Sequence, residues 1–276
     1  MILKKLQFLL LPVIFTSCLK TPDEEVYFLS EIYFPEIKYK TGQLDSVYRS
    51  EFWINIIDFG NQEDYDAGFI DFARHIPLER LVDSSGYLVN QGKVITANYD
   101  DQWPFIVYSS SNDTIAFHIA HLIQALGYSR VYFYEGGPDD WQEHGAALNL
   151  TYKGFMDWYN THHPFTDTLQ FLVDVQPESW YNGSGPLEGH IPGAINIPAG
   201  TVADTLDNEL VLVDDGKALT DTIPYDISKI VVYSSRECLS KEHAFLEAAQ
   251  QLGYNQLYRF PSGYETWKEK GNAFEN

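Results

Sequence analysis

The stretch Ile230-Val231-Val232-Tyr233-Ser234-Ser235 repeats, with small changes, the earlier stretch Ile106-Val107-Tyr108-Ser109-Ser110. Behind each stretch, four anchor residues follow at matching places, and the two members of every pair are 126 positions apart; the pairs are Gly127/Gly253, Gly137/Gly263, Trp141/Trp267 and Gly145/Gly271. The chain therefore contains one unit twice, and the two copies should share a fold.

Each copy opens with a short apolar run that ends in aspartate, residues 52–58 in the first and 169–174 in the second. Runs of this kind predict buried strands. Between residues 239 and 252 apolar residues recur at helical spacing, and Gly253 is the expected C-terminal stop of that helix. Strands that alternate with helices predict a mainly parallel sheet flanked by helices in each copy, so the fold class is α/β.

The copies differ in length ahead of a compact glycine turn. The opening aspartates Asp58 and Asp174 are 116 positions apart, whereas Gly68/Gly189 and Pro77/Pro198 are 121 apart, so the second copy carries five extra residues upstream of the turn. The segment Gly183-Ser184-Gly185 is the predicted place for them. The length of 276 residues accommodates two domains of roughly 120 residues each.

The domain organisation that we predict has five parts. They are a signal peptide at 1–18, a tether and N-terminal extension at 19–50, a first domain at 51–148, a linker at 149–168 and a second domain at 169–276. The linker contains Tyr152, Trp158 and Tyr159, so we expect it to pack against the domains.

The N-terminal segment has the pattern of an export signal. Lys4 and Lys5 form a basic region, and the apolar run from Leu6 to Phe15 is too short to span a bilayer. Thr16-Ser17-Cys18 resembles a bacterial lipobox, although Phe15 replaces the usual aliphatic residue. We expect lipidation at Cys18 and anchoring to the bacterial cell envelope, at the outer membrane. The alternative is an ordinary secretory signal with an incidental cysteine.

The charge of the chain restricts its partners. The formal net charge is -21, and loss of Lys4 and Lys5 with the signal leaves 16 basic against 39 acidic residues, or -23. Such a chain repels nucleic acid and anionic headgroups, so we expect no nucleic-acid partner. With Cys18 lipidated, Cys238 is the one remaining cysteine of the sequence. A lone thiol in an exported protein is either buried and inert or reactive.

A set of motifs runs through the second half in a fixed order: Val173-Asp174-Val175, Gly189-His190-Ile191-Pro192-Gly193-Ala194, Ile197-Pro198, Val231-Val232-Tyr233, Leu252-Gly253-Tyr254, and Gly263 with Trp267. The first half keeps a looser version: Ile57-Asp58, Gly68, Ile76-Pro77, Val107-Tyr108, Gly127-Tyr128, Gly136-Gly137 and Trp141. In this order and spacing the chain resembles the rhodanese (thiosulfate sulfurtransferase-like) family in its tandem two-domain form.

The resemblance implies a mechanism. In members of this family, a cysteine directly follows the central strand, and the backbone N–H groups of the next loop converge on its sulfur. The N-terminus of the following helix lowers the thiol pKa. The thiolate takes a sulfane sulfur from a small donor, becomes a persulfide, and passes the sulfur to a thiol or other thiophilic acceptor. No cofactor is implied.

The chain departs from the family pattern at the nucleophile position itself. Ser109 and Ser234 stand directly after the two strands, and Gly60 and Gln176 replace the arginine that often follows the opening aspartate. The first loop, residues 109–113, has no thiol, so we predict a non-catalytic first domain. In the second loop a cysteine comes four residues late, at Cys238.

Cys238 is the candidate nucleophile. The predicted active-site loop also contains Ser234, Ser235, Arg236, Glu237, Leu239, Ser240 and Lys241, with Asp174 and His190 in support. In the functional interpretation, Cys238 at the helix N-terminus takes over the nucleophile's role beside two cationic residues. In the alternative, it is a small residue in the first turn of an inactive domain, because a four-residue shift moves the sulfur off the focus of the loop amides.

Other candidate sites are weaker. His162-His163 with Asp157 or Asp167, and His118 with His121, lack a known metal-ligand spacing, so we expect no metal. Ser234 near His243 or His190 lacks the Gly-x-Ser-x-Gly elbow of hydrolases. The residue six positions after Cys238 is Ala244, whereas the phosphatases that resemble this fold need arginine there.

Two functions remain open at this point. The chain is an exported sulfurtransferase that acts through Cys238, or it is an inactive binding or scaffold lipoprotein that has kept the fold. The sequence does not identify a protein partner.

Overall fold

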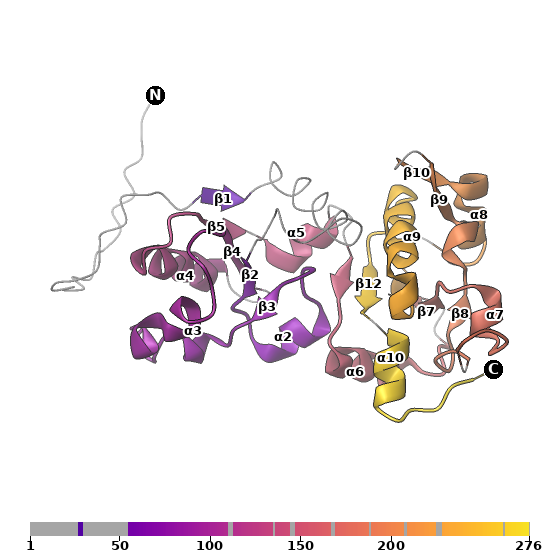
Figure 1. Cartoon of the computed structure of the whole chain (residues 1–276), viewed down its shortest axis with the longest axis horizontal. Helices are drawn as coiled ribbons and strands as arrows, with labels where there is room; N and C mark the ends of the chain where they lie inside the picture. The colour runs from indigo at the N-terminus through magenta and orange to yellow at the C-terminus, as the bar shows by residue number, and fades with distance from the viewer. Residues whose placement is uncertain are drawn as a thin grey trace.

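The structure is a computed structural model that describes residues 27–29, 55–109, 113–134, 136–143, 147–166, 169–187, 189–206, 209–224, 228–261 and 263–275. It contains the two predicted α/β units, coloured from indigo to yellow along the chain (Figure 1). The predicted signal peptide, with Lys4, Lys5 and Cys18, lies outside the described residues. None of the helices in the described part of the chain is long and apolar enough to cross a membrane.

The first unit contains five strands and the helices between them. In chain order its elements are β1 (Tyr27–Leu29), β2 (Asn55–Asp58), α2 (Gln62–Ala67), β3 (Arg74–His75), η1 (Leu78–Arg80), η2 (Val89–Gly92), α3 (Lys93–Thr96), β4 (Phe105–Tyr108), α4 (Asp113–Ala125), β5 (Val131–Tyr134) and α5 (Gly137–Glu143).

The second unit follows the same plan and adds a hairpin. Its elements are β6 (Leu148–Asn149), α6 (Tyr152–His162), β7 (Gln170–Asp174), α7 (Glu178–Tyr181), β8 (Ile195–Asn196), η3 (Ala199–Thr201), β9 (Ala203–Leu206), β10 (Glu209–Leu212), η4 (Val213–Gly216), α8 (Lys217–Thr220), β11 (Lys229–Tyr233), η5 (Arg236–Cys238), α9 (Leu239–Gln251), β12 (Leu257–Phe260) and α10 (Gly263–Glu269).

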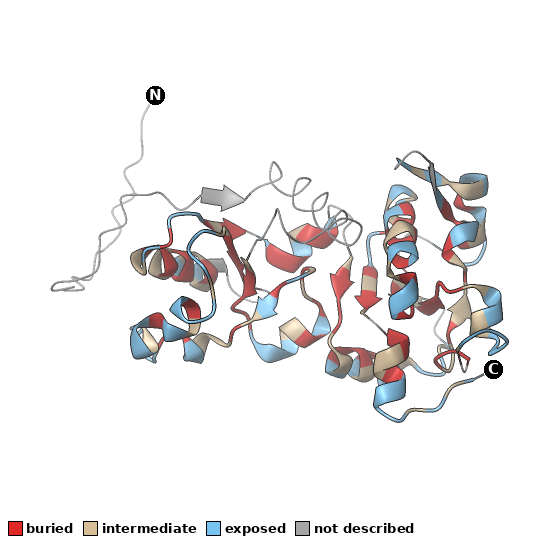
Figure 2. Cartoon of the chain, viewed as in Figure 1, coloured by how far each residue is buried: buried red, intermediate tan, exposed pale blue. Residues whose placement is uncertain are grey.

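Both five-stranded sheets are parallel throughout, as the sequence predicted. The first has the order β1-β5-β4-β2-β3, and the second has the matching order β6-β12-β11-β7-β8. The central strands β4 and β11 are buried on both faces. In β11, Ile230 and Val232 pack with α9, whereas Val231 and Tyr233 pack with α6 and α10. The buried residues accordingly follow the sheets and the inner faces of the helices (Figure 2).

The predicted helix of the second copy is confirmed. It is α9, Leu239–Gln251, with Leu252 as its C-cap. Gly253 follows with a φ of +94°, a backbone conformation that favours glycine. The predicted insertion at Gly183-Ser184-Gly185 lies in the turn after the short helix α7.

Each unit contains a turn of left-handed backbone conformation that the sequence pattern did not predict. Asn90 and Gln91 have φ of 48° and 56°, and Asp214 and Asp215 have φ of 46° and 53°. A glycine with positive φ completes each turn and starts a short helix, α3 or α8. Gly216 has a φ of 71°, which favours glycine, and a Cβ there would lie 2.4 Å from a terminal methyl group of Leu252.

The segment between the two domains begins with a strand that completes the second sheet. Leu148, the last residue of the predicted first domain, and Asn149 of the linker form β6, which pairs with Tyr258 and Arg259 of β12 at the edge of the second sheet. The short strand β1 occupies the corresponding edge of the first sheet beside β5. Each sheet is thus completed by a strand from the segment that precedes its unit.

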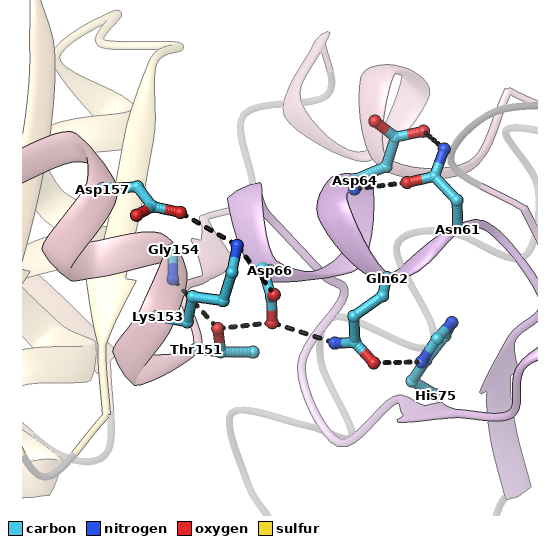
Figure 3. Close-up of polar contacts among 9 residues, drawn as sticks. All are labelled: Asn61, Gln62, Asp64, Asp66, His75, Thr151, Lys153, Gly154 and Asp157. Carbon is cyan, nitrogen blue, oxygen red and sulfur yellow. Dashed lines mark hydrogen bonds and ion pairs between the residues drawn. The ribbon is translucent and has the colours of Figure 1, made fainter.

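Polar contacts around the buried Asp66 join the linker helix α6 to helix α2 of the first unit (Figure 3). The Asp66 carboxylate accepts hydrogen bonds from Thr151 Oγ1 at 2.7 Å and from Gln62 Nε2 at 3.0 Å, and Lys153 Nζ lies 3.5 Å from it. A Cβ on Gly154 would lie 1.7 Å from the Asp66 carbonyl oxygen. The two helices therefore meet at backbone distance, which only glycine permits.

A second set of contacts crosses between the units near β12. Asp71 lies 3.6 Å from Arg259 Nη1, and its carboxylate accepts a hydrogen bond from Asn149 Nδ2 at 2.7 Å. Gln142 Nε2 donates to the Leu257 carbonyl at 3.3 Å, and the Tyr258 hydroxyl donates to Gln142 Oε1, also at 3.3 Å. The edge of the second sheet is thereby bound directly to the first unit.

Candidate functional site

The loop between β11 and α9 is the region in which the sequence placed the site. Ser234 follows the strand directly and is fully buried. Its hydroxyl donates to Glu242 Oε2 at 2.5 Å, and Glu242 pairs in turn with Arg259 Nε of β12. Glu242 and Arg259 are themselves buried. The residue at the family's nucleophile position is therefore bound into an internal ion pair that continues to Asp71 of the first unit.

The first amide of the loop already has an internal acceptor. Ser235 N donates to Gln176 Oε1 at 3.2 Å. Gln176 is held by Asp174, because its N–H donates to Asp174 Oδ1 at 2.8 Å and its Nε2 donates to Oδ2 at 3.1 Å. Gln176 therefore fixes the loop from the position where the family often has arginine, and it brings no positive charge.

The second amide of the loop is held by a carboxylate. Arg236 N donates to both oxygens of Glu265, at 3.0 and 3.2 Å, and Glu265 belongs to α10. The Arg236 side chain lies 3.7 Å from Glu269, one turn further along the same helix. Tyr264 N donates to the Ser234 carbonyl at 3.3 Å. Helix α10 is therefore attached to the loop at both ends, through Tyr264 and Glu265 in its first turn and through Glu269 at its last residue.

Cys238 ends the short turn η5 and is the N-cap of α9. It is 3% exposed, and its N–H donates to the Ser235 carbonyl at 2.9 Å. Burial raises the pKa of the Cys238 thiol; Ser235 and Lys241 act to lower it, whereas Asp174 and Glu237 raise it further. The thiol is therefore mainly protonated at neutral pH, which is the reverse of what a sulfur-accepting nucleophile needs.

The remaining predicted loop residues do not form a cavity around the sulfur. Arg236, Glu237, Ser240 and Lys241 are exposed, and Leu239 is half-buried. The two cationic side chains that the sequence placed beside Cys238 therefore face solvent. The role of Cys238 as nucleophile stays a prediction, and its burial and raised pKa speak against it.

The two supporting residues have structural roles in the geometry. Asp174 is fully buried, and burial raises its pKa, while hydrogen bonds from Gln176 and Tyr233 act to lower it. His190 stacks on Tyr181, with ring centroids 3.7 Å apart, and its Nδ1 bonds to the Tyr181 carbonyl at 3.0 Å. Its backbone also bridges to Glu275. His190 thus holds the glycine turn in place.

The weaker candidates form two separate histidine pairs in the described structure. His118 and His121 lie on α4, and His163 follows α6 and stacks on Tyr159. Asp167 lies outside the described residues, as do residues 110–112 of the first loop. Within the ranges that the structure describes, no three metal-ligating side chains come together.

Three residues of the site were not found from the sequence: Glu242, Arg259 and Glu265. Arg259 carried the clearest signal, since it is a charged residue inside the apolar strand Leu257–Phe260. Glu242 lies on α9 among acidic and basic neighbours that are mostly exposed, so its burial was hidden. Glu265 meets Arg236 only through the fold, because the two residues are far apart in the sequence.

Fold and site together define a class: a tandem α/β protein in which each unit has a parallel sheet flanked by helices, with the candidate site in the strand-to-helix loop after β11. A family model described as a rhodanese-like domain matches residues 43–144 and 156–270. The chain belongs to the rhodanese-like domain family, in the tandem two-domain form that the sequence predicted.

Solved structures give a similar but distant comparison. One is SseA from Escherichia coli, described under 3-mercaptopyruvate sulfotransferases, with 19% identity, 86% of this chain and 98% of that chain covered, and a TM-score of 0.32. Another is a probable thiosulfate sulfurtransferase, with 16% identity, 84% and 100% covered, and a TM-score of 0.35. No curated protein matches the sequence.

Proposed function

We propose that this protein is a rhodanese-fold binding or scaffold module that has given up persulfide chemistry. The observation that carries the proposal is that the Ser234 hydroxyl and two backbone amides of the loop are already hydrogen-bonded to side chains of the same chain. Ser234 is bound by Glu242, Ser235 N by Gln176 and Arg236 N by Glu265. A cradle for a persulfide needs such amides directed at the sulfur, and here they are directed at side chains.

The state of Cys238 supports the same proposal. A sulfur-accepting cysteine must be ionised and accessible, because the thiolate is the nucleophile. Cys238 is 3% exposed, and burial raises its pKa. The nearby carboxylate of Asp174 raises that pKa further, so a second negative charge on sulfur is disfavoured.

The second candidate function is sulfur transfer from a small sulfane donor, through Cys238, to a thiol acceptor. One observation favours it: Cys238 is the N-cap residue of α9, where Ser235 and Lys241 act to lower a thiol pKa that burial raises overall. For this function the loop must open, because in the structure the sulfur is enclosed.

The two functions are separated by sulfur loading. The mature protein is incubated with thiosulfate and, in a second sample, with polysulfide, and its intact mass is measured beside a Cys238→Ala control. We expect no gain of one sulfur by the native protein, while thiol titration after unfolding shows that Cys238 is reduced. A one-sulfur gain that disappears in Cys238→Ala would establish the sulfurtransferase.

We further propose that the protein is exported and lipid-anchored at Cys18, in the bacterial cell envelope at the outer membrane. The support is the basic, apolar and small-residue pattern of residues 1–18. Palmitate labelling of the full chain tests the anchor. Labelling should be lost in Cys18→Ala, and continued labelling of that variant would remove Cys18 as the lipid site.

A further inference from the structure

The amine of Lys229 lies against an aromatic ring at the start of the central strand of the second unit. Lys229 is the first residue of β11, and its side chain is half-buried. Its Nζ lies 3.7 Å from the centroid of the Tyr258 ring on the neighbouring strand β12. The matching position of the first unit is Pro104, so the first unit has no amine at this place.

The Tyr258 ring is held firmly by the first unit. Its hydroxyl donates to Gln142 Oε1 of α5 at 3.3 Å. A Cβ on Gly68 would lie 3.3 Å from the ring, so the backbone of the first unit also approaches it closely. The ring packs against the apolar clusters of both units. Lys229 therefore faces a fixed aromatic surface at the junction of the two units.

The amine of Lys229 has no counter-ion among the residues that the structure describes, although the chain has 39 acidic side chains. By contrast, the exposed Lys153 lies 2.9 Å from the Asp157 carboxylate. The cross-strand neighbour of Lys229 is the uncharged Gln170, which accepts a hydrogen bond from Trp158 Nε1 at 2.9 Å. Burial therefore acts on the Lys229 amine without an opposing carboxylate.

This environment makes the amine a better nucleophile near neutral pH. Burial lowers the pKa of Lys229 from 10.5 to about 8. At pH 7.5 about a quarter of such an amine is unprotonated, compared with about one part in a thousand at the ordinary value. Desolvated lysines form Schiff bases with carbonyl compounds for this reason. Lys229 lies roughly 16 Å along the strand from Ser234, so the loop around Cys238 takes no part.

We propose that Lys229 is a covalent binding site for small aldehydes, which it takes up as an imine supported by the Tyr258 ring. The Nζ attacks the carbonyl carbon and a C–N bond forms. The carbinolamine then loses the aldehyde oxygen as water, with both hydrogens supplied by the amine. Protonation of the imine gives an iminium whose charge lies over the ring, as the ammonium did. A carbamate from carbon dioxide fits less well, because its negative charge would face the negative face of the ring.

The test measures reductive ethylation of each lysine by acetaldehyde and cyanoborohydride at pH 7.5, with the modified residues located by peptide mass spectrometry. The mature native protein is compared with the same protein in denaturant. We expect native Lys229 to react at least ten times faster than the exposed Lys93 of α3. In denaturant the two rates should be similar, because the aromatic surface is lost.

A matched pair of variants at Gln170 tests the missing counter-ion. Gln170→Glu places a carboxylate beside Lys229 across the strands, and a nearby opposite charge favours the protonated amine. We expect ethylation of Lys229 to slow at least threefold in Gln170→Glu and to stay within twofold of the native rate in Gln170→Met. Equal far-ultraviolet circular dichroism and thermal midpoints establish that both variants are folded.

Three outcomes would overturn the proposal. They are a native Lys229 that reacts no faster than Lys93, an advantage of Lys229 that persists in denaturant, and a folded Gln170→Glu variant that reacts at the native rate. None of these measurements involves Cys238. A failure of the proposed function would appear separately, as sulfur gain by native Cys238 in the mass measurement.

Discussion

The two domains differ most at the place where their sequences agree best. In the first, Ala116 of α4 and Phe133 of β5 are buried together in an apolar core. At the matching positions the second domain has Glu242 and Arg259, a buried ion pair that binds Ser234. The same fold thus accommodates either an apolar pair or a buried ion pair next to the serine that follows the central strand. The difference teaches that the second domain has an ion-paired polar centre behind its serine, whereas the first domain has apolar packing at the same positions.

The largest expected effect comes from breaking that ion pair. Arg259→Ala leaves Glu242 buried without its guanidinium, and removal of one partner from a buried pair costs about 3–5 kcal/mol. Urea unfolding should show a loss of that size. The double variant Glu242→Ala/Arg259→Phe imports the residues of the first domain, and we expect it to recover most of the loss. If the free energy of unfolding of Arg259→Ala lies within about 1 kcal/mol of that of the native protein, the comparison of the two domains is contradicted.

Contact between the two copies is tested at Gly154. A Cβ there would lie 1.7 Å from the Asp66 carbonyl oxygen, so Gly154→Ala forces α6 and α2 apart. We expect at least about 3 kcal/mol of destabilisation, since backbone does not yield as a side chain does. Gly200→Ala is the control, because its Cβ would meet nothing within 4 Å, and it should stay within about 0.5 kcal/mol. Equal effects of the two substitutions would rule out this close approach.

The glycine turn of the second domain and its counterpart in the first domain have different residues, Gly193 and Phe72, at one left-handed position. Gly193 has a φ of 79°, and a Cβ on it would lie 2.8 Å from the ring of Phe165, so Gly193→Ala should cost about 2 kcal/mol. Phe72 occupies the corresponding place with a φ of 62° and is 40% exposed. Phe72→Gly relieves backbone strain but loses packing, so we expect a change below about 1 kcal/mol. Thermal unfolding of both variants checks the contrast, and a larger effect at Phe72 would reverse it.

Local sequence patterns predicted the elements of the fold, whereas contacts between distant residues could not be predicted from them. The repeat, the strand patterns and Gly253 predicted both parallel sheets and α9, because periodicity and turn chemistry are local. Cys238 was located correctly at the start of α9, but its burial was not predictable. The contacts of Glu242, Arg259 and Glu265 join residues distant in sequence, and they depend on the packing of α9, β12 and α10. Those contacts decide whether the loop is open.

The smallest effect concerns Lys229, whose counterpart in the first domain is Pro104. Burial lowers the pKa of Lys229 from 10.5 to about 8, and its ammonium lies 3.7 Å from the Tyr258 ring centroid. Because the folded-state pKa is the lower one, the unfolded chain binds more protons between pH 8 and 10.5, and stability rises with pH across that window. Lys229→Met should flatten this rise in denaturant unfolding, and Lys93→Met should leave it unchanged. A rise of native size in Lys229→Met would dismiss the assignment.

The central claim, that internal contacts have closed the site around Cys238, is tested most directly by the rate at which a small alkylating reagent modifies that thiol. The rate is measured by mass spectrometry from pH 6 to 10 on the native mature protein and on the same protein in denaturant. Burial and the raised pKa predict modification at least about a hundredfold slower in the native protein, with its rise displaced to higher pH. Native alkylation as fast as in the unfolded chain, or a rise at lower pH, would contradict the account.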